Sequence, residues 1–202
     1  MNCRSVKLEK FFPTARIVGR NNSGGRQQMN EKQTTQVLIA LGANLGQRAR
    51  QLENAWRTLC ADIHIRPVRI SRLLVTKPVG GPPDQPDFLN AAAIFETDLS
   101  PIELFDLLRQ IESQGGRRRH EFWGARTIDL DILLYGSIIL NTSRLTIPHP
   151  RIAWRLFVLK PASEIAPDML HPVFNLTITE LLELAKMNFR LAGMNSATWQ
   201  NV

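Results

Sequence analysis

The sequence predicts an α+β sandwich of ferredoxin-like βαββαβ order, with additional strands and a C-terminal helix. Two observations predict this fold class. Short apolar segments typical of strands are interspersed with longer segments that repeat apolar residues at helical spacing, and turns containing Gly or Pro separate them. The chain has 202 residues, of which 44% are hydrophobic and 21% charged, so it is long enough for one domain with a full core.

The first half of the predicted order is strand, helix, strand and strand. Residues 37–41 form a short buried strand that ends in a glycine-containing turn. Residues 63–75 and 88–97 alternate as two further strands, and the loop between them, residues 76–86, is rich in Pro and Gly. The helix that follows the first strand is expected to bury one stripe of apolar residues: Leu45, Ala49, Leu52, Trp56 and Leu59.

The second half begins with a helix whose start is marked by three residues. Ser100 is the expected N-cap, Pro101 the first helical residue, and Glu103 the partner that completes a capping box. A basic loop and a strand that begins at Thr127 follow, and the capping-box pattern recurs at residues 177–180 before the terminal helix. The apolar residues that the first of these helices is expected to bury are Ile102, Phe105, Leu108 and Ile111.

Two acids lie on one face of the strand that begins at Thr127. Asp129 and Asp131 are two residues apart, so their side chains point the same way and lie about 6.5–7 Å apart along the backbone. Like charges in this position repel each other, and a cationic group must compensate them. The opposite face of the strand is apolar and consists of Ile128, Leu130 and Ile132.

A basic loop immediately precedes this strand and contains Arg117, Arg118, Arg119, His120 and Arg126. Arginines bind phosphates and carboxylates bind hard metal ions, so the loop and the strand together predict a nucleoside-triphosphate site. The alternative is a solvated edge strand whose acids pair with the neighbouring arginines. For Asp129 alone this alternative is favoured, whereas for the whole segment the site is favoured.

Composition restricts the class of protein. No apolar run approaches the roughly 20 residues that span a bilayer, so we expect no membrane-spanning segment. The two cysteines, Cys3 and Cys60, make no disulfide framework; we expect Cys60 to be a buried free thiol and the protein to be cytoplasmic. The sequence contains neither a Walker A motif nor a dinucleotide-binding fingerprint, so side chains must hold any nucleotide.

Residues 1–33 differ from the rest of the chain. They contain seven Lys or Arg and two acids, a net charge of +5 out of the chain's +7. They show no apolar period, so we expect a disordered basic extension followed by a folded domain over residues 34–202. The remaining +2 gives the folded part little attraction for nucleic acid, and we expect no specific nucleic-acid partner.

Four segments of the chain resemble the hydroxymethyldihydropterin pyrophosphokinase family of the folate pathway. Residues 123–131 are similar to the family signature, and residues 40–46, 84–91 and 147–157 agree with it in order and spacing. The resemblance covers residues 36–185 and implies transfer of a pyrophosphoryl group from ATP to the hydroxymethyl group of 6-hydroxymethyl-7,8-dihydropterin, giving AMP and the pterin diphosphate. The expected partners are these two small molecules, and we expect a monomer.

The resemblance also implies roles for residues around the phosphates. Asp129 and Asp131 match a pair that ligates two Mg²⁺ ions, and Arg117 and Arg119 match arginines of a loop that closes over the reactants. The implied catalytic residues are Arg117, Trp123, Arg126, Asp129 and Asp131. The implied ATP-binding residues are Glu112, Arg119, Arg126, Thr146, His149 and Arg155.

A second set of roles concerns the pterin. Phe88 and Phe157 match a pair of aromatic residues that sandwich the flat bicycle, and Asn90 matches an amide that binds its edge. The chain departs from the family pattern at Phe88, Ala125 and Pro150, none of which is a metal ligand. The implied substrate-binding residues are Thr76, Val79, Phe88, Asn90, Trp123 and Phe157.

Two alternative functions are compatible with parts of the sequence. A ferredoxin-like sheet with aromatic residues and a basic extension is also typical of RNA-binding modules. Against this, Asp129 and Asp131 would repel phosphate unless a metal ion were bound. The other alternative is a relative that binds pterin or nucleotide without turnover, which the intact Asp129, Asp131, Arg126 and His149 oppose.

Overall fold

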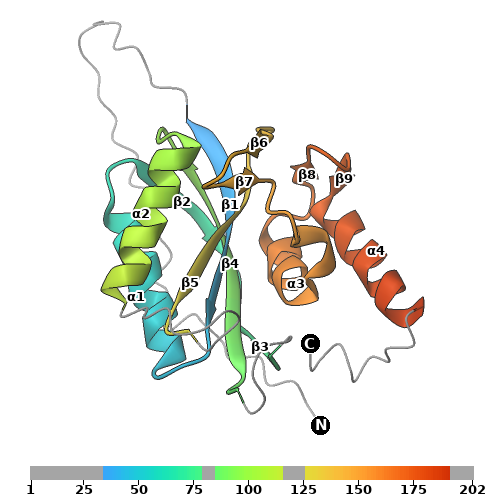
Figure 1. The fold of residues 1–202 in the computed structure, drawn as a ribbon, viewed down its shortest axis with the longest axis horizontal. Helices are drawn as coiled ribbons and strands as arrows, with labels where there is room; N and C mark the ends of the chain where they lie inside the picture. The colour runs from blue at the N-terminus through green and yellow to red at the C-terminus, as the bar shows by residue number, and fades with distance from the viewer. Residues whose placement is uncertain (1–33, 79–84, 116–125, 192–202) are drawn as a thin grey trace, which may run out of the picture.

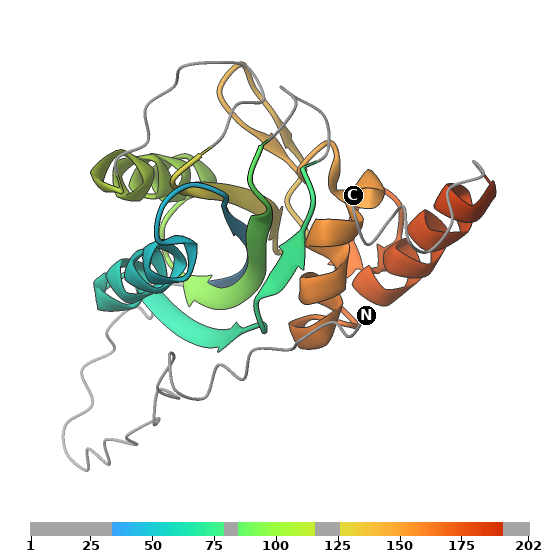
Figure 2. The same ribbon diagram turned by 90° about the horizontal axis from the view of Figure 1, so that it is seen from below.

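The computed structural model describes residues 34–78, 85–115 and 126–191, which form a layered α+β structure (Figure 1). Helices α1 (Arg48–Ala61) and α2 (Pro101–Gln114) cover one face of an antiparallel sheet. Helix α3 (Leu156–Ile165) covers the other face, and α4 (Ile178–Leu191) packs against α3. Seen from below, the two pairs of helices lie on opposite sides of the curved sheet (Figure 2).

The strand order confirms the predicted fold class. The described sheet has the order β2-β4-β1-β5, β3 also pairs with β4, and its pairings are antiparallel, as in a ferredoxin-like βαββαβ fold. The additional strands form two short hairpins, and a 3₁₀ helix, η2 (Ile152–Trp154), precedes α3. The sheet strands are β1 (Thr35–Ala43), β2 (Ile65–Ile70), β3 (Leu74–Thr76), β4 (Phe88–Thr97) and β5 (Asp129–Tyr135); the hairpins are β6 (Leu140–Asn141) with β7 (Thr146–Ile147), and β8 (Leu170–His171) with β9 (Leu176–Thr177).

Side chains of the central strand β1 alternate between two apolar clusters. Val37, Ile39 and Leu41 pack with α1 and α2, whereas Leu38 packs with α3 and α4. Both faces are covered because β1 lies between β4 and β5 in the middle of the sheet. A continuous run of apolar residues is typical of a strand buried on both faces, as predicted for residues 37–41.

Alternation in β5 holds up to Ile132 and then changes. Ile39 and Leu38, adjacent in β1, pair with Ile132 and Leu134, so Leu133 is the extra residue of a β-bulge. Leu133 and Leu134 therefore both belong to the cluster under α3 and α4. The predicted strand began at Thr127, two residues before the observed start.

The prediction of one continuous strand over residues 63–75 was wrong. The segment forms β2 and β3 with a break between them, and the register on β4 shifts between Pro67 and Arg69. Pro67 has no N–H for the ladder, which accounts for an irregular edge strand. At the break, Ser71 Oγ accepts a hydrogen bond from the Ala92 N–H at 2.9 Å and so replaces a ladder contact.

The helices also differ from the predicted pattern in places. In α1, Leu52, Trp56 and Leu59 are buried as predicted, whereas Leu45 precedes the helix and Ala49 is exposed. Gly46 adopts a φ of 60°, and the turn it makes delays the helix start to Arg48. In α2, Leu108 and Ile111 are buried, Ile102 and Phe105 are only partly buried, and Leu104 is buried although it was not predicted.

Helix α3 was missing from the sequence prediction. Its buried residues lie on most sides of the helix and leave only a narrow polar face with Lys160, Ser163 and Glu164, and Pro161 lies inside it. Cys60, expected to be buried, is only partly buried; burial raises the pKa of this free thiol to about 11. Within the described residues no helix is long and apolar enough to cross a membrane, and the expected extension over residues 1–33 lies outside them.

Replacing Ser100 with alanine should lower the free energy of unfolding by about 1 kcal/mol. Ser100 Oγ accepts the Glu103 N–H at 3.3 Å, and the Glu103 carboxylate accepts the Ser100 N–H at 2.8 Å, so the predicted capping box is present. Urea denaturation would measure the change. Ser113→Ala, on the exposed side of the same helix, is the control and should change the free energy by less than about 0.5 kcal/mol. Equal losses in both variants would contradict a role of the cap.

Candidate active site

A cavity of about 260 Å³ opens on the face of the sheet that α3 covers. Three adjacent strands form one wall, and η2 with the first turn of α3 forms the other. Across the sheet, Gly42 of β1 pairs with Asn90 of β4 on one side and with Asp129 of β5 on the other. The sheet therefore brings an amide and a carboxylate from distant parts of the sequence to the two sides of one glycine.

The Asn90 amide is held in a fixed orientation beside the cavity. Its nitrogen donates to Thr76 Oγ1 at 2.9 Å, and both residues are buried. A Cβ atom on Gly42 would lie 3.2 Å from Asn90 Oδ1, so a larger residue at position 42 would crowd the amide. Phe88 and Phe157 line the same cavity, as the predicted pair of aromatic residues requires.

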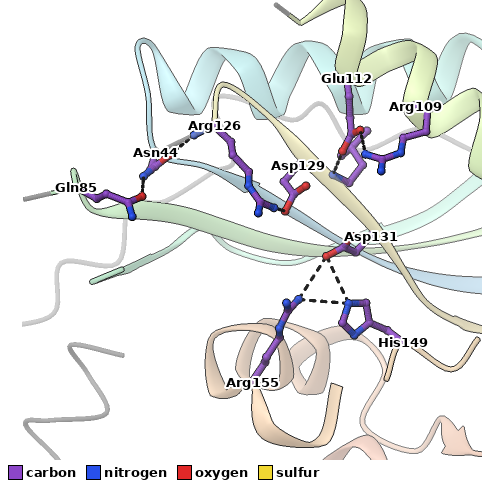
Figure 3. Close-up of polar contacts among 10 residues, drawn as sticks. Asn44, Gln85, Arg109, Glu112, Arg126, Asp129, Asp131, His149 and Arg155 are labelled. Carbon is purple, nitrogen blue, oxygen red and sulfur yellow. Dashed lines mark hydrogen bonds and ion pairs between the residues drawn. The ribbon is translucent and has the colours of Figure 1, made fainter. Parts of the chain in front are cut away.

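Asp129 and Asp131 both line the cavity, and each has a cationic partner (Figure 3). Arg126 forms an ion pair with Asp129. Asp131 Oδ2 lies 3.4 Å from Arg155 Nη1 and 3.7 Å from His149 Nε2. The predicted orientation of the two acids on one face, and their compensation by cations, are confirmed.

His149 is the most enclosed titratable group beside the acids. Burial lowers the pKa of His149, and the positive charges of Arg155 and Arg151 lower it further. The negative charge of Asp131 acts in the opposite direction and raises it. The Arg151 N–H donates to His149 Nδ1 at 3.0 Å, and Arg155 Nη1 lies 3.4 Å from His149 Nε2, the nitrogen that faces Asp131. His149 Nε2 therefore lies between the Asp131 carboxylate and the Arg155 guanidinium.

Arg155 is likewise partly enclosed. Burial lowers its pKa and the nearby Asp131 opposes the shift, but the guanidinium remains charged because its ordinary pKa is far above neutral. Its Cζ lies 5.8 Å from the centre of the Phe157 ring. Arg155 thus lies between the aromatic wall of the cavity and the Asp131 carboxylate.

Asn44 connects three segments near the cavity (Figure 3). Asn44 is buried, and its side-chain Oδ1 accepts a hydrogen bond from the Arg126 backbone N–H at 2.6 Å. The backbone N–H of Asn44 donates to the Arg126 carbonyl at 3.0 Å. Its Nδ2 donates to Gln85 Oε1 at 3.3 Å. These bonds connect the end of β1 to the residue that pairs with Asp129 and to the chain before β4.

Two predicted ATP-binding residues lie away from the cavity. Glu112 of α2 is 1% exposed, and its carboxylate accepts the Leu130 N–H of β5 at 2.8 Å and pairs with Arg109 at 2.7 Å. Thr146 of β7 donates through its hydroxyl to Asn141 Oδ1 at 3.3 Å. Neither residue lines the cavity, and their role near the nucleoside stays a prediction.

Four predicted site residues, Val79, Arg117, Arg119 and Trp123, lie outside the described residues. Four others that contribute to the site were not predicted as site residues: Asn44 and Gln85, which connect segments, and Arg151 and Trp154, which line the cavity. The signal for Asn44 was a polar residue directly after a buried strand. For Arg151 and Trp154 it was their place between His149 and Arg155.

One part of the site has carboxylates suited to metal ions and arginines suited to phosphate; the adjoining part is an aromatic cavity with a buried amide. This combination defines an enzyme class, the transferases that move a phosphate-containing group to a heterocyclic substrate. Sequence comparison specifies the family: residues 38–167 match the 7,8-dihydro-6-hydroxymethylpterin-pyrophosphokinase (HPPK) family. The chain belongs to this family of ATP-dependent pyrophosphokinases of folate biosynthesis.

Curated relatives agree with this assignment. The chain is 46% identical over 145 residues to the 2-amino-4-hydroxy-6-hydroxymethyldihydropteridine pyrophosphokinase of Haemophilus influenzae, covering 72% of this chain and 89% of the relative. It is 45% identical over 131 residues to the enzyme of the same name from Bacillus subtilis, covering 65% of this chain and 78% of the relative.

Solved structures support the fold. The crystal structure of wild-type Plasmodium falciparum HPPK-DHPS with STZ-DHP is similar with a TM-score of 0.62 at 16% identity. The similarity covers 84% of this chain and 45% of the Plasmodium chain, so this chain spans less than half of the length of that protein. At this identity the likeness concerns the fold alone.

Asn44→Ala should lower turnover and the free energy of unfolding together. The change leaves the Arg126 N–H without its side-chain acceptor in a buried position, which costs about 1–3 kcal/mol. Asn44→Asp keeps an acceptor but loses the donor to Gln85, so it should keep more stability than Asn44→Ala. Urea denaturation and steady-state kinetics would measure both effects. Wild-type turnover in Asn44→Ala would contradict a positioning role.

Proposed function

We propose that the cavity binds 6-hydroxymethyl-7,8-dihydropterin and that the adjoining face with Asp129 and Asp131 binds the triphosphate of ATP. The observation that supports this most directly is the register of three adjacent strands: Gly42 of β1 pairs with Asn90 of β4 on one side and with Asp129 of β5 on the other. Neighbouring strands are about 4.8 Å apart, so the backbones that bear the two side chains are about 10 Å apart. That separation suits a flat heterocycle whose short hydroxymethyl arm reaches the phosphates.

The heterocycle would lie between aromatic rings with its polar edge at the sheet. Phe88 and Phe157 supply flat apolar surfaces on two walls of the cavity, and stacked aromatic rings attract one another. The Asn90 amide offers both a donor and an acceptor to the pterin edge, and its bond to Thr76 fixes which atom faces which way. Thr76 contributes to binding through this bond.

The described residues fit a pair of Mg²⁺ ions shared with ATP. Mg²⁺ is usually held by one or two carboxylates together with substrate phosphates and water. Among the described residues no cluster of three or more His, Cys, Asp or Glu side chains forms an all-protein metal cage, whereas Asp129 and Asp131 face one cavity. We assign two Mg²⁺ ions to these carboxylates; when bound, the ions neutralise phosphate oxygens and align the triphosphate.

Cations beside the acids would bind the phosphates directly. A guanidinium has five N–H donors and can bridge two phosphate oxygens, so we assign Arg126 and Arg155 to this role. His149, whose Nε2 faces Asp131 and Arg155, would lie beside the same phosphates. In the transfer, a bond forms between the hydroxymethyl oxygen and the β-phosphorus, and the bond from that phosphorus to the oxygen shared with the α-phosphate breaks, so AMP leaves with that oxygen. The hydroxyl proton passes to solvent water.

The remaining assignments also stay proposals. We propose a cytoplasmic monomer whose partners are ATP and the dihydropterin, with residues 34–202 as the catalytic domain. An RNA-binding module is not favoured, because the chain belongs to an enzyme family and the cavity face bears Asp129 and Asp131. A relative without turnover is not favoured either, since Arg126 and His149 accompany the acids.

The protein should convert ATP and the dihydropterin to AMP, not ADP, in the presence of Mg²⁺. Asp129→Asn and Asp131→Asn should each lower kcat by about 100-fold or more, a loss typical of removing one group that stabilises charge in a transition state. The matched control is Asp106→Asn on α2, where the exposed acid pairs with Arg144 of the turn between β6 and β7. Nucleotide products would be separated by chromatography. Near-normal kcat in either site variant would rule out the two-metal assignment.

A protein that begins at Met29 should keep the turnover of the full chain. Residues 1–28 contain six Lys or Arg and one acid and show no apolar period, so they offer no surface for docking on the core. Removing them should also abolish any weak, salt-sensitive binding to RNA. Kinetics and gel shifts at two salt concentrations, on both proteins, test this. A crippled truncated enzyme would show that the domain boundary is misplaced.

A further inference from the structure

Trp154 is a large aromatic residue that lines the cavity while remaining 61% exposed. It is the last residue of η2, whose other residues, Ile152 and Ala153, are buried in the cluster under α3 and α4. Water-exposed indole surface is unfavourable, and large side chains of this kind are common where a ligand covers them. Because Trp154 is both exposed and part of the cavity wall, it is a candidate for contact with a ligand.

The backbone around Trp154 is firmly held. The Ile152 N–H donates to the His149 carbonyl at 3.0 Å, and the Trp154 N–H donates to the Arg151 carbonyl at 3.2 Å. One further bond, from the Arg155 N–H to the Ile152 carbonyl at 3.3 Å, closes the turn. The indole is thus carried by the same short turn that positions His149 and Arg155 beside Asp131.

The neighbours of Trp154 indicate which ligand it would contact. Trp154 shares its cavity with Phe88, Asn90 and Phe157, the residues assigned to the heterocycle, and also with Asp131 and Arg155 on the phosphate side. Glu112 and Thr146, the residues predicted for the nucleoside, do not line this cavity. An indole offers a flat apolar surface and a single N–H donor, which suits a flat heterocycle better than a triphosphate.

We propose that Trp154 is a substrate-binding residue that covers the mouth of the cavity and contacts the dihydropterin. This inference rests on the proposed function, which assigns the cavity to that substrate. Phe157 follows Trp154 by three residues, so η2 and the first turn of α3 present two aromatic side chains to one cavity. The indole would exclude water from the ring and add apolar contact that is absent in a protein with a small residue at this position.

The test compares Trp154→Ala and Trp154→Phe with the wild-type protein. Titration calorimetry with the dihydropterin, in Mg²⁺ and a non-hydrolysable ATP analogue, should give a Kd raised about tenfold in Trp154→Ala, as expected for loss of one aromatic contact. Trp154→Phe should stay within about threefold because it keeps an aromatic ring. Ile139→Ala is the control, since Ile139 is 63% exposed and does not line the cavity.

Further measurements separate binding from structure. In Trp154→Ala, KM for the dihydropterin should rise with its Kd, while kcat, the Kd of the ATP analogue and the melting temperature stay as in the wild type. The proposal is overturned if the dihydropterin Kd is unchanged, if nucleotide affinity falls instead, or if Trp154→Phe is as weak as Trp154→Ala. Failure of the wild-type protein itself to form AMP would instead overturn the proposed function.

Discussion

Two carboxylates on one face of β5 repel each other and lose hydration where that face meets other parts of the chain, so cations must lie beside them. Arg126, just before β5, pairs with Asp129, and Arg155, just before α3, lies beside Asp131. The ion pair between Arg155 and Asp131 therefore fixes where the start of α3 lies relative to β5. The same guanidiniums are the groups suited to phosphate, so the requirements of folding and of binding coincide.

Register decides which face the acids occupy. Because side chains alternate along a strand, a shift of β5 by one residue would move the acids into the core beneath α1 and α2. Two contacts oppose such a shift: the Glu112 carboxylate holds the Leu130 N–H, and Asn44 holds both backbone polar groups of Arg126. Glu112 was predicted to bind the nucleotide; in the described residues its carboxylate instead holds the backbone of β5.

The resemblance to the family predicted most of the polar residues that line the cavity, but it did not predict every aromatic one. Phe88 and Phe157 were predicted from the family pattern, whereas Trp154 was found only because the structure places it in the same cavity. The two cases differ in exposure: the phenylalanines are partly buried, and the indole lies at the mouth.

Sequence alone determined the βαββαβ order, the capping boxes and the common face of Asp129 and Asp131, because these depend on local chain geometry with periods of 2 and 3.6 residues. It did not determine helix α3, the break between β2 and β3, or the pairing of Asn44 with Arg126. Those depend on contacts between residues far apart in the chain: α3 is apolar on most sides and becomes a helix against the sheet, and Asn44 meets Arg126 only once β1 and β5 are neighbours.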